Sequence, residues 1–201
     1  MLPRLPLLFL LLVVAAWPAQ AQNSYPGGAT GYVRSDVRVQ YYDIQGRSAG
    51  DLLQAMLRGG PEWQGQRYFG LTNTEVRYSY TRIPTTTGCD LTDIEVHLDI
   101  TITLPRWQPF SGTPYALERA WHQFDRALQH HEAGHQRLAE EEGEMIRRTL
   151  VGVRTPTCEA MDAEAQQQVE RVRATYNNLH RGYDSRTEHG RSQGAIWPMP
   201  E

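Results

Sequence analysis

A histidine, a glutamate and a second histidine form the pattern His131-Glu132-Ala133-Gly134-His135, the H-E-x-x-H arrangement of zinc-dependent hydrolases. Residues four apart lie one turn apart on the same face of a helix, so both imidazoles can reach one metal ion. Zinc accepts neutral imidazole nitrogens, and three protein ligands leave a fourth position for water. Glu132 then stands where it can take a proton from that water and pass it to a leaving amine. The motif therefore predicts a Zn²⁺ site that hydrolyses peptide bonds.

The residues that follow the motif narrow the choice of a third metal ligand. His135 is followed by Gln136-Arg137-Leu138 and not by the glycine turn of the metzincins. Glu140, Glu141 and Glu142 continue the same helix too soon to fold back toward the histidines. We interpret them as a solvated acidic face, with Glu142 the one that could support the site indirectly. The third ligand is therefore expected from a later part of the chain.

Three residues near the C-terminus are candidates for that ligand. We predict His189, because zinc favours imidazole and because an irregular tail from Gly182 onward could be drawn back over the site. Asp184, in the same tail, is the first alternative. Glu164, at the margin of the apolar face of an earlier helix, is the second. Tyr183 could donate its hydroxyl to a developing oxyanion.

The N-terminus and the cysteines both indicate an exported protein. Arg4, the apolar run over residues 7–16 and Ala19-Gln20-Ala21 predict a signal peptide over residues 1–21. The run is shorter than the roughly 20 residues of a membrane-spanning helix. Cys89 and Cys158 are the two cysteines of the chain, and in an exported protein they predict a disulfide. We expect a secreted or periplasmic protein with no stable membrane anchor after cleavage.

Composition restricts the class of partner. The formal net charge is −3 with mixed signs, which argues against a nucleic-acid partner. The five tryptophans and ten tyrosines indicate an ordered globular protein. We expect one domain over residues 22–201, long enough for a substantial core.

Hydrophobic periodicity predicts the elements that carry these residues. Period-two alternation predicts strands over residues 32–44, 68–83 and 94–104, the last ended by Pro105. Spacings of three and four predict a short helix over residues 48–58 with Ser48 as N-cap, a long helix from Pro114 to near Gly152, and a second long helix over residues 159–179. Strands precede helices, so the fold class is α+β.

The two motif histidines continue the apolar stripe of the long helix, and therefore point inward. That stripe consists of Leu117, Trp121, Phe124, Leu128, His131, His135, Leu138, Met145 and Ile146. The second helix carries its buried side on Met161, Ala165, Val169, Val172, Tyr176 and Leu179. Buried imidazoles need partners for their ring nitrogens, which a metal ion would supply.

The chain resembles a family of bacterial exported proteins of unknown function, described as predicted secreted zinc-dependent proteases. The matching features are Tyr42-Asp43-Ile44-Gln45-Gly46, Gly60-Pro61, Gly88-Cys89, Thr103-Leu104-Pro105, Trp121, the His131–His135 motif, and Tyr183-Asp184 through His189-Gly190. The resemblance covers nearly the whole chain after the signal peptide. It implies a zincin-like fold, in which a small, mostly antiparallel sheet packs on the motif helix and the cleft lies between them.

Two functions remain open from the sequence. The first is a zinc metallopeptidase that acts on a protein or peptide, including a peptide of the cell wall, with Glu132 as the catalytic base. The second is a zinc-binding envelope factor for binding or assembly, without hydrolysis. Glu132 favours the first, because a purely structural zinc site has no use for a carboxylate beside an open metal position.

Overall fold

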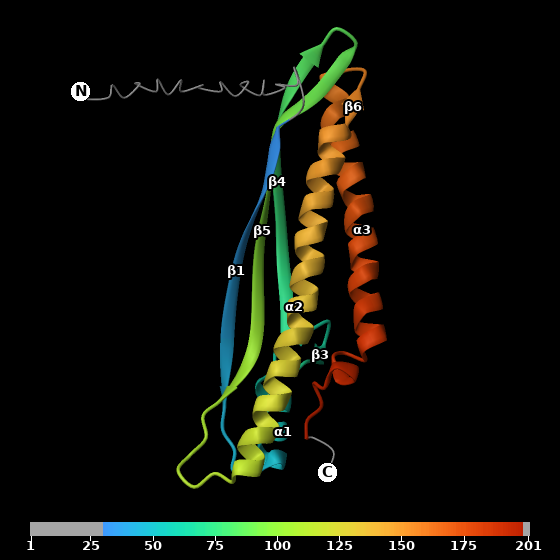
Figure 1. The fold of residues 1–201 in the computed structure, drawn as a ribbon. Coiled ribbons are helices and arrows are strands. Elements are labelled where there is room, and N and C mark those ends of the chain that lie inside the picture. The colour runs from blue at the N-terminus through green and yellow to red at the C-terminus, as the bar shows by residue number, and fades with distance from the viewer. Residues whose placement is uncertain (1–29, 199–201) are drawn as a thin grey trace, which may run out of the picture.

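The computed structural model describes residues 30–198, and Figure 1 shows their fold. The predicted signal peptide lies outside the described residues. Of the helices between residues 30 and 198, none combines the length and the apolarity that a membrane crossing requires.

A four-stranded sheet with three long strands forms one layer of the molecule. Its long strands are β1 (Gly31–Ile44), β4 (Leu71–Thr85) and β5 (Gly88–Trp107), in the order β1-β5-β4. The central strand β5 runs parallel to β1 and antiparallel to β4, so the sheet is mixed. A short strand, β6 (Arg154–Thr155), pairs with the start of β5, and β2 (Glu62–Trp63) pairs with β3 (Gln66–Arg67) in a separate hairpin.

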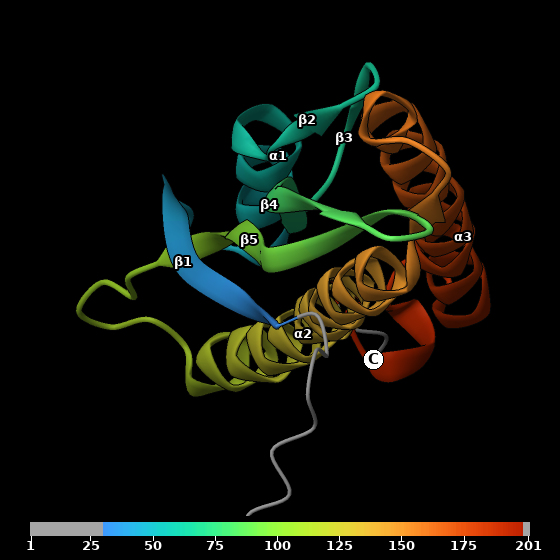
Figure 2. The same ribbon diagram turned by 90° about the horizontal axis from the view of Figure 1, so that it is seen from above.

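Three helices complete the predicted α+β fold: α1 (Ala49–Gly59), α2 (Tyr115–Gly152) and α3 (Met161–Thr187). Ser48 caps α1 as predicted, in a capping box with Asp51. The 38-residue α2 runs along the sheet, and α3 lies beside α2, as both ribbon views show (Figures 1 and 2). Two 3₁₀ turns flank α3: η1 (Cys158–Ala160) and η2 (Arg191–Gln193).

The core lies between β5 and α2. Alternate residues of β5, including Ile94, Val96 and Leu98, are fully buried, while the intervening polar residues face away from the helices. Phe124 and Ile146 of α2 are fully buried against them. This layer fixes the rotation of α2 about its axis, and therefore the direction in which the motif histidines point.

Two predicted element ends were wrong. The second long helix continues through Gly182 to Thr187, because one glycine costs a helix only about 1 kcal/mol and the buried spacing continues beyond it. Strand β5 continues past Pro105 to Trp107. Pairing with β4 ends at Thr103, so Pro105 lies where one side of β5 is an open edge, a position in which proline is tolerated.

Two predicted stripe residues are also exposed. Met145 of α2 is 41% exposed, because its neighbours Gly143 and Ile146 take the inner face there. Leu179 of α3 is 39% exposed, because Tyr176 and His180 lie on the side that faces α2.

The predicted disulfide between Cys89 and Cys158 is present, with a Cα–Cα distance of 5.1 Å. It joins the start of β5 to η1, immediately before α3. The N-terminal end of α3 is therefore covalently tied to the sheet.

Candidate metal centre

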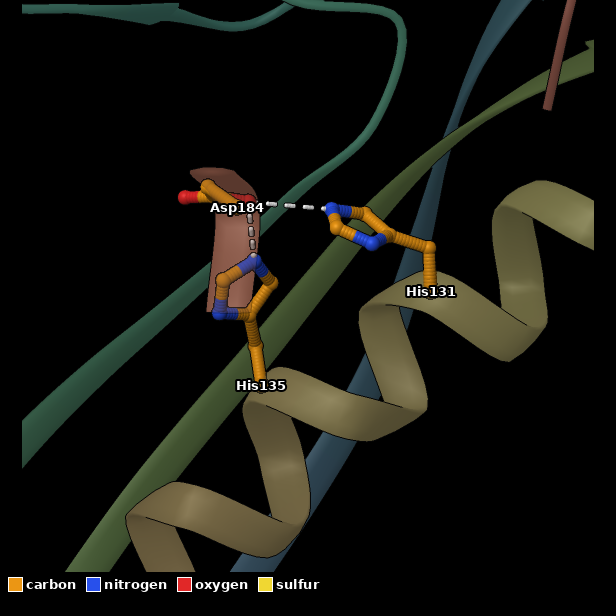
Figure 3. Close-up of side chains that lie close together, drawn as sticks. All are labelled: His131, His135 and Asp184. Carbon is orange, nitrogen blue, oxygen red and sulfur yellow. Dashed lines mark hydrogen bonds and ion pairs between the residues drawn. The ribbon is translucent and has the colours of Figure 1, made fainter. Parts of the chain in front are cut away.

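Two helices bring three potential metal ligands together. His131 and His135 lie on α2, and Asp184 lies on the last turn of α3 (Figure 3). Asp184 Oδ1 is 3.2 Å from His131 Nε2 and 2.9 Å from His135 Nε2. One ligand atom from each residue lies within 4.8 Å of the others, a spacing that allows all three to hold one metal ion.

The three side chains are shielded to different degrees. Burial is nearly complete for the His131 ring, whereas Asp184 keeps 27% of its side chain exposed. Burial alone would raise the pKa of Asp184, but hydrogen bonds from His131 and His135 outweigh it and hold that pKa well below its usual range. Burial lowers the pKa of His131, but Asp184 and Glu132 more than reverse this, so the net shift is upward. The Asp184 carboxylate therefore favours its charged form.

Each histidine is oriented by a partner on its second ring nitrogen. The Nδ1 of His131 is 3.0 Å from Oε1 of Gln193, in η2. The Nδ1 of His135 is 2.9 Å from Nδ1 of His180, whose ring stacks on that of His135. Both Nε2 atoms are thereby directed at Asp184. Such partners fix the tautomer and the orientation of metal-binding imidazoles.

Glu132 is held beside the three residues by strand β4. Its side chain is buried, and Thr72 donates a hydrogen bond of 2.8 Å to its Oε2. Burial raises the pKa of Glu132, and the bond from Thr72 opposes that shift in part. Gly70 permits the approach, since a Cβ at that position would lie 2.8 Å from Glu132 Oε1. The carboxylate therefore occupies a tight, fixed position.

The profile of a bacterial protein family of unknown function, DUF922, matches residues 39–190. The chain belongs to this family. Comparison with curated proteins and with solved structures finds no match.

The stretch that matches DUF922 contains the whole candidate centre. His131, Glu132, His135 and Asp184 all fall within residues 39–190, whereas Gln193 lies three residues beyond them. The match therefore includes the residues of the candidate centre but assigns them no chemistry.

The glycine of the motif is explained by Tyr183. The Tyr183 ring stacks on His131, with centroids 5.0 Å apart and planes at 10°. Its hydroxyl donates to the carbonyl oxygen of His131 at 3.2 Å and accepts from Gln193 Nε2 at 3.1 Å. A Cβ at Gly134 would lie 2.1 Å from that hydroxyl. Gly134 thus allows α3 to close on α2 at the ligands.

The other predicted site residues lie in different settings. The Nδ1 of His189 is 3.7 Å from Asp184 Oδ1, but its side chain is 61% exposed and lies outside the three-residue group. Glu164 accepts a hydrogen bond from Gln168 and stands twenty residues before Asp184 on the same helix, about 30 Å away. The Tyr183 hydroxyl is engaged with the backbone of α2.

Several residues that build the centre were missed from the sequence. Thr72, Gly70 and Gln193 gave no periodic signal. His180 did: Tyr176, His180 and Asp184 follow at intervals of four, which continues the helix past Gly182 and puts His180 beside Asp184.

A cleft of about 660 Å³ opens beside these residues. Its floor is α2, with Glu132, His135 and Glu142, and one wall is the β4 segment from Leu71 to Thr74. The opposite wall is α3. Its remaining lining residues are Trp63, Gln64, Tyr68, Gly70, Ala174, Asn177, Asn178, His180, Arg181, Asp184 and His189. The candidate centre is therefore open to a ligand of peptide size.

Proposed function

We propose that this DUF922 protein is a zinc-dependent peptidase in which His131, His135 and Asp184 hold the metal. The observation that carries the proposal is the convergence of these three residues next to the buried carboxylate of Glu132, beside an open cleft that Glu132, His135 and Asp184 line. An open cleft and a free base fit hydrolysis better than a closed structural zinc site, which has four protein ligands.

The hydrogen bonds of His131 fit a bound cation. Gln193 Oε1 accepts at Nδ1, so a neutral His131 carries its proton there and directs the lone pair of Nε2 at the Asp184 carboxylate. Without a metal ion, Nε2 can instead donate its own proton to Asp184; a metal ion would take the place of that proton between the two atoms, which lie 3.2 Å apart. Two imidazoles and one carboxylate are a donor set that suits zinc.

The side chains divide the chemistry as follows. A bound zinc ion would act as a Lewis acid toward a carbonyl oxygen and would lower the pKa of a water molecule. Glu132 accepts the proton of the attacking water and returns it to the leaving amine. Thr72 keeps the Glu132 carboxylate in place through its hydroxyl. The chain supplies every group needed to move this proton.

The free edge of β4 favours an extended peptide as the substrate. The carbonyl oxygen of Val76 accepts a hydrogen bond from Arg173 of α3, so the backbone polar groups of Val76 face away from β5. In an antiparallel strand the backbone groups of successive residues point alternately toward and away from the partner strand. Those of Thr72 and Thr74 therefore also face away from β5, toward the cleft. A peptide can add to such an edge through main-chain hydrogen bonds. Its backbone would then pass next to Glu132.

We also propose that the protein acts outside the cytoplasm, in the periplasm or after secretion. The disulfide supports this, because disulfides form and persist in oxidising compartments. A protein or a cell-wall peptide is then within reach as a substrate.

Metal analysis combined with a peptide digest tests the function. We expect one zinc per chain in the wild type and cleavage of a peptide library, read by mass spectrometry. Glu132→Gln should retain zinc and fold but cut nothing, and the exposed Glu141→Gln serves as the matched control. Cleavage by Glu132→Gln at the wild-type rate would refute the proposed base. Stoichiometric zinc without any cleavage by the wild type would support a non-catalytic zinc-binding factor instead.

A further inference from the structure

Glu142 is a buried carboxylate that the proposed chemistry does not use. The sequence predicted a solvated face over Glu140, Glu141 and Glu142, and for the last of these the prediction was wrong. Glu141 is exposed and Glu140 accepts from Gln136, but Glu142 is only 8% exposed and lines the cleft. Within residues 30–198, no hydrogen bond or ion pair is made by its carboxylate. Glu142 is thus a free acceptor that faces the ligand space.

The helix places Glu142 in line with the metal centre. It follows His135 by seven residues on the same face of α2, which is about 10 Å along the helix axis. Strand β4 runs beside this stretch: Thr72 contacts Glu132, and Thr74 lines the cleft farther along. An extended chain covers this distance in about three residues, at roughly 3.3 Å each.

The nearest cation does not neutralise Glu142. Arg173 is close enough to lower the pKa of Glu142, but burial dominates and the net shift is upward. The guanidinium of Arg173 is committed elsewhere, since it donates to the Val76 carbonyl oxygen at 3.0 Å and to Glu170 at 3.3 Å. Within residues 30–198, no side-chain polar atom that is sealed from solvent lacks a hydrogen bond, so the Glu142 oxygens reach the cleft. A cationic ligand in the cleft could pair with them there.

We propose that Glu142 binds a lysine or arginine side chain of the peptide substrate, about three residues from the bond that is cleaved. The proposal rests on the peptidase function and deepens it, because it assigns a basic substrate residue to a named position in the cleft. Thr74, Ala174 and Asn177 line the cleft too, and none of them carries a charge. Arg181 also lines the cleft, but its guanidinium donates to Asn178 and it stands three residues before Asp184, at the end of α3 that meets the metal centre. The site therefore selects a substrate by charge at a distance from the reacting bond.

A binding experiment tests the proposal without any need for hydrolysis. The zinc-reconstituted Glu132→Gln variant is titrated into fluorescein-labelled decapeptides of Ala, Ser and Thr. Each peptide carries a single Lys at one position, and its control carries the uncharged norleucine at the same position; the set covers every position in turn. For one position we expect the Lys peptide to bind about 10- to 100-fold more tightly than its norleucine control, as measured by fluorescence anisotropy. Adding Glu142→Gln should abolish the difference and leave the norleucine peptides unaffected, while adding Glu141→Gln should preserve it.

The outcomes separate this proposal from the peptidase function. No preference for Lys at any position, or a preference that survives Glu142→Gln, would overturn the role of Glu142. If Glu142 served only as a structural partner of Arg173, Glu142→Gln would lower the Tm and leave peptide preference unchanged. We expect the Tm to stay level or rise, because the substitution removes a buried charge. Selective binding by a wild type that cuts nothing would refute the peptidase and retain the cation site.

Discussion

The substitution Gly134→Ala tests whether the closure of α3 on α2 forms the metal centre. An added Cβ would lie 2.1 Å from the Tyr183 hydroxyl oxygen, 2.3 Å from Cζ and 2.7 Å from Cε1. The ring cannot move aside freely, since it stacks on His131 and shares hydrogen bonds with the His131 carbonyl oxygen and Gln193. Its displacement would carry the adjacent Asp184 away from the histidines.

The effect of Gly134→Ala on the free energy of unfolding is the sum of a stabilising and two destabilising contributions. Replacing glycine by alanine inside a helix stabilises it by up to about 1 kcal/mol. Overpacking costs about 1–3 kcal/mol, and loss of the Tyr183 hydrogen bonds adds about 1 kcal/mol. We therefore expect Gly134→Ala to lower the free energy of unfolding by about 2 kcal/mol. Zinc affinity should fall as well, because Asp184 loses its position.

A double-mutant cycle isolates the contact with Tyr183. In the Tyr183→Ala background the steric conflict is absent, so Gly134→Ala should become neutral or stabilise by up to about 1 kcal/mol. Urea unfolding of the metal-free proteins would then give a coupling of about 3 kcal/mol. Gly152→Ala is the control, because nothing lies within 4 Å of a Cβ there, and it should not destabilise. An equal cost of Gly134→Ala in both backgrounds would refute the reasoning.

Three further predictions concern the ligands, the disulfide and an ion pair. Asp184→Ala should lose zinc on dialysis, whereas His189→Ala should retain it, by elemental analysis; the reverse result would restore His189 as the third ligand. The double variant Cys89→Ser/Cys158→Ser should lose about 4 kcal/mol of stability in urea unfolding, the loop entropy for a separation of 69 residues, and an unchanged midpoint would contradict this. Hydrogen bonds from the arginines three and four residues later lower the pKa of Glu144 from 4.5 to about 2. This contribution is complete above about pH 4.5 and disappears as the pH falls toward 2, so the Tm difference between wild type and Glu144→Gln should vanish over that range.

The part of the centre that lies on one helix was predictable from the sequence. His131, Glu132 and His135 are fixed by the periodicity of a single helix, and α2 begins and ends where that pattern indicates. The apolar alternation of β5 likewise predicted a covered face toward the helices. In both cases neighbours along the chain determine the geometry.

The position of Asp184, the candidate third ligand, depends on where α3 ends. The sequence predicts an irregular tail from Gly182 onward, which places Asp184 and His189 in one segment and favours the imidazole of His189 as the ligand. In the structure the helix passes through Gly182, and Asp184 lies on the face that meets α2. His189 falls after the left-handed residue that ends the helix. The spacing of Tyr176, His180 and Asp184 continues the helical pattern across Gly182, because a single glycine costs a helix too little to end it.

The contacts of Glu132 could not be derived from periodicity. Thr72 stands 60 residues away from Glu132, and the two meet only because β4, an outer strand in the order β1-β5-β4, lies against α2. Sequence patterns indicate which face of a strand is apolar, but strand order depends on the packing of the whole chain. The same close contact between β4 and α2 explains why position 70 is a glycine, since a side chain there would collide with the Glu132 carboxylate.

The site depends on holding two long helices in register at both ends. The disulfide ties the start of α3 to β5, and Asp184 lies about 35 Å farther along that helix, where Tyr183 packs on Gly134. A rotation of α3 by one residue, about 100°, would turn Asp184 away from the histidines. The buried Trp197 adds a third restraint, because it donates to the Ala49 carbonyl oxygen and so holds the tail that carries Gln193. The geometry of the candidate centre is therefore set by contacts with α1, α2, β4 and β5 together, and the motif supplies only the two histidines around which these elements close.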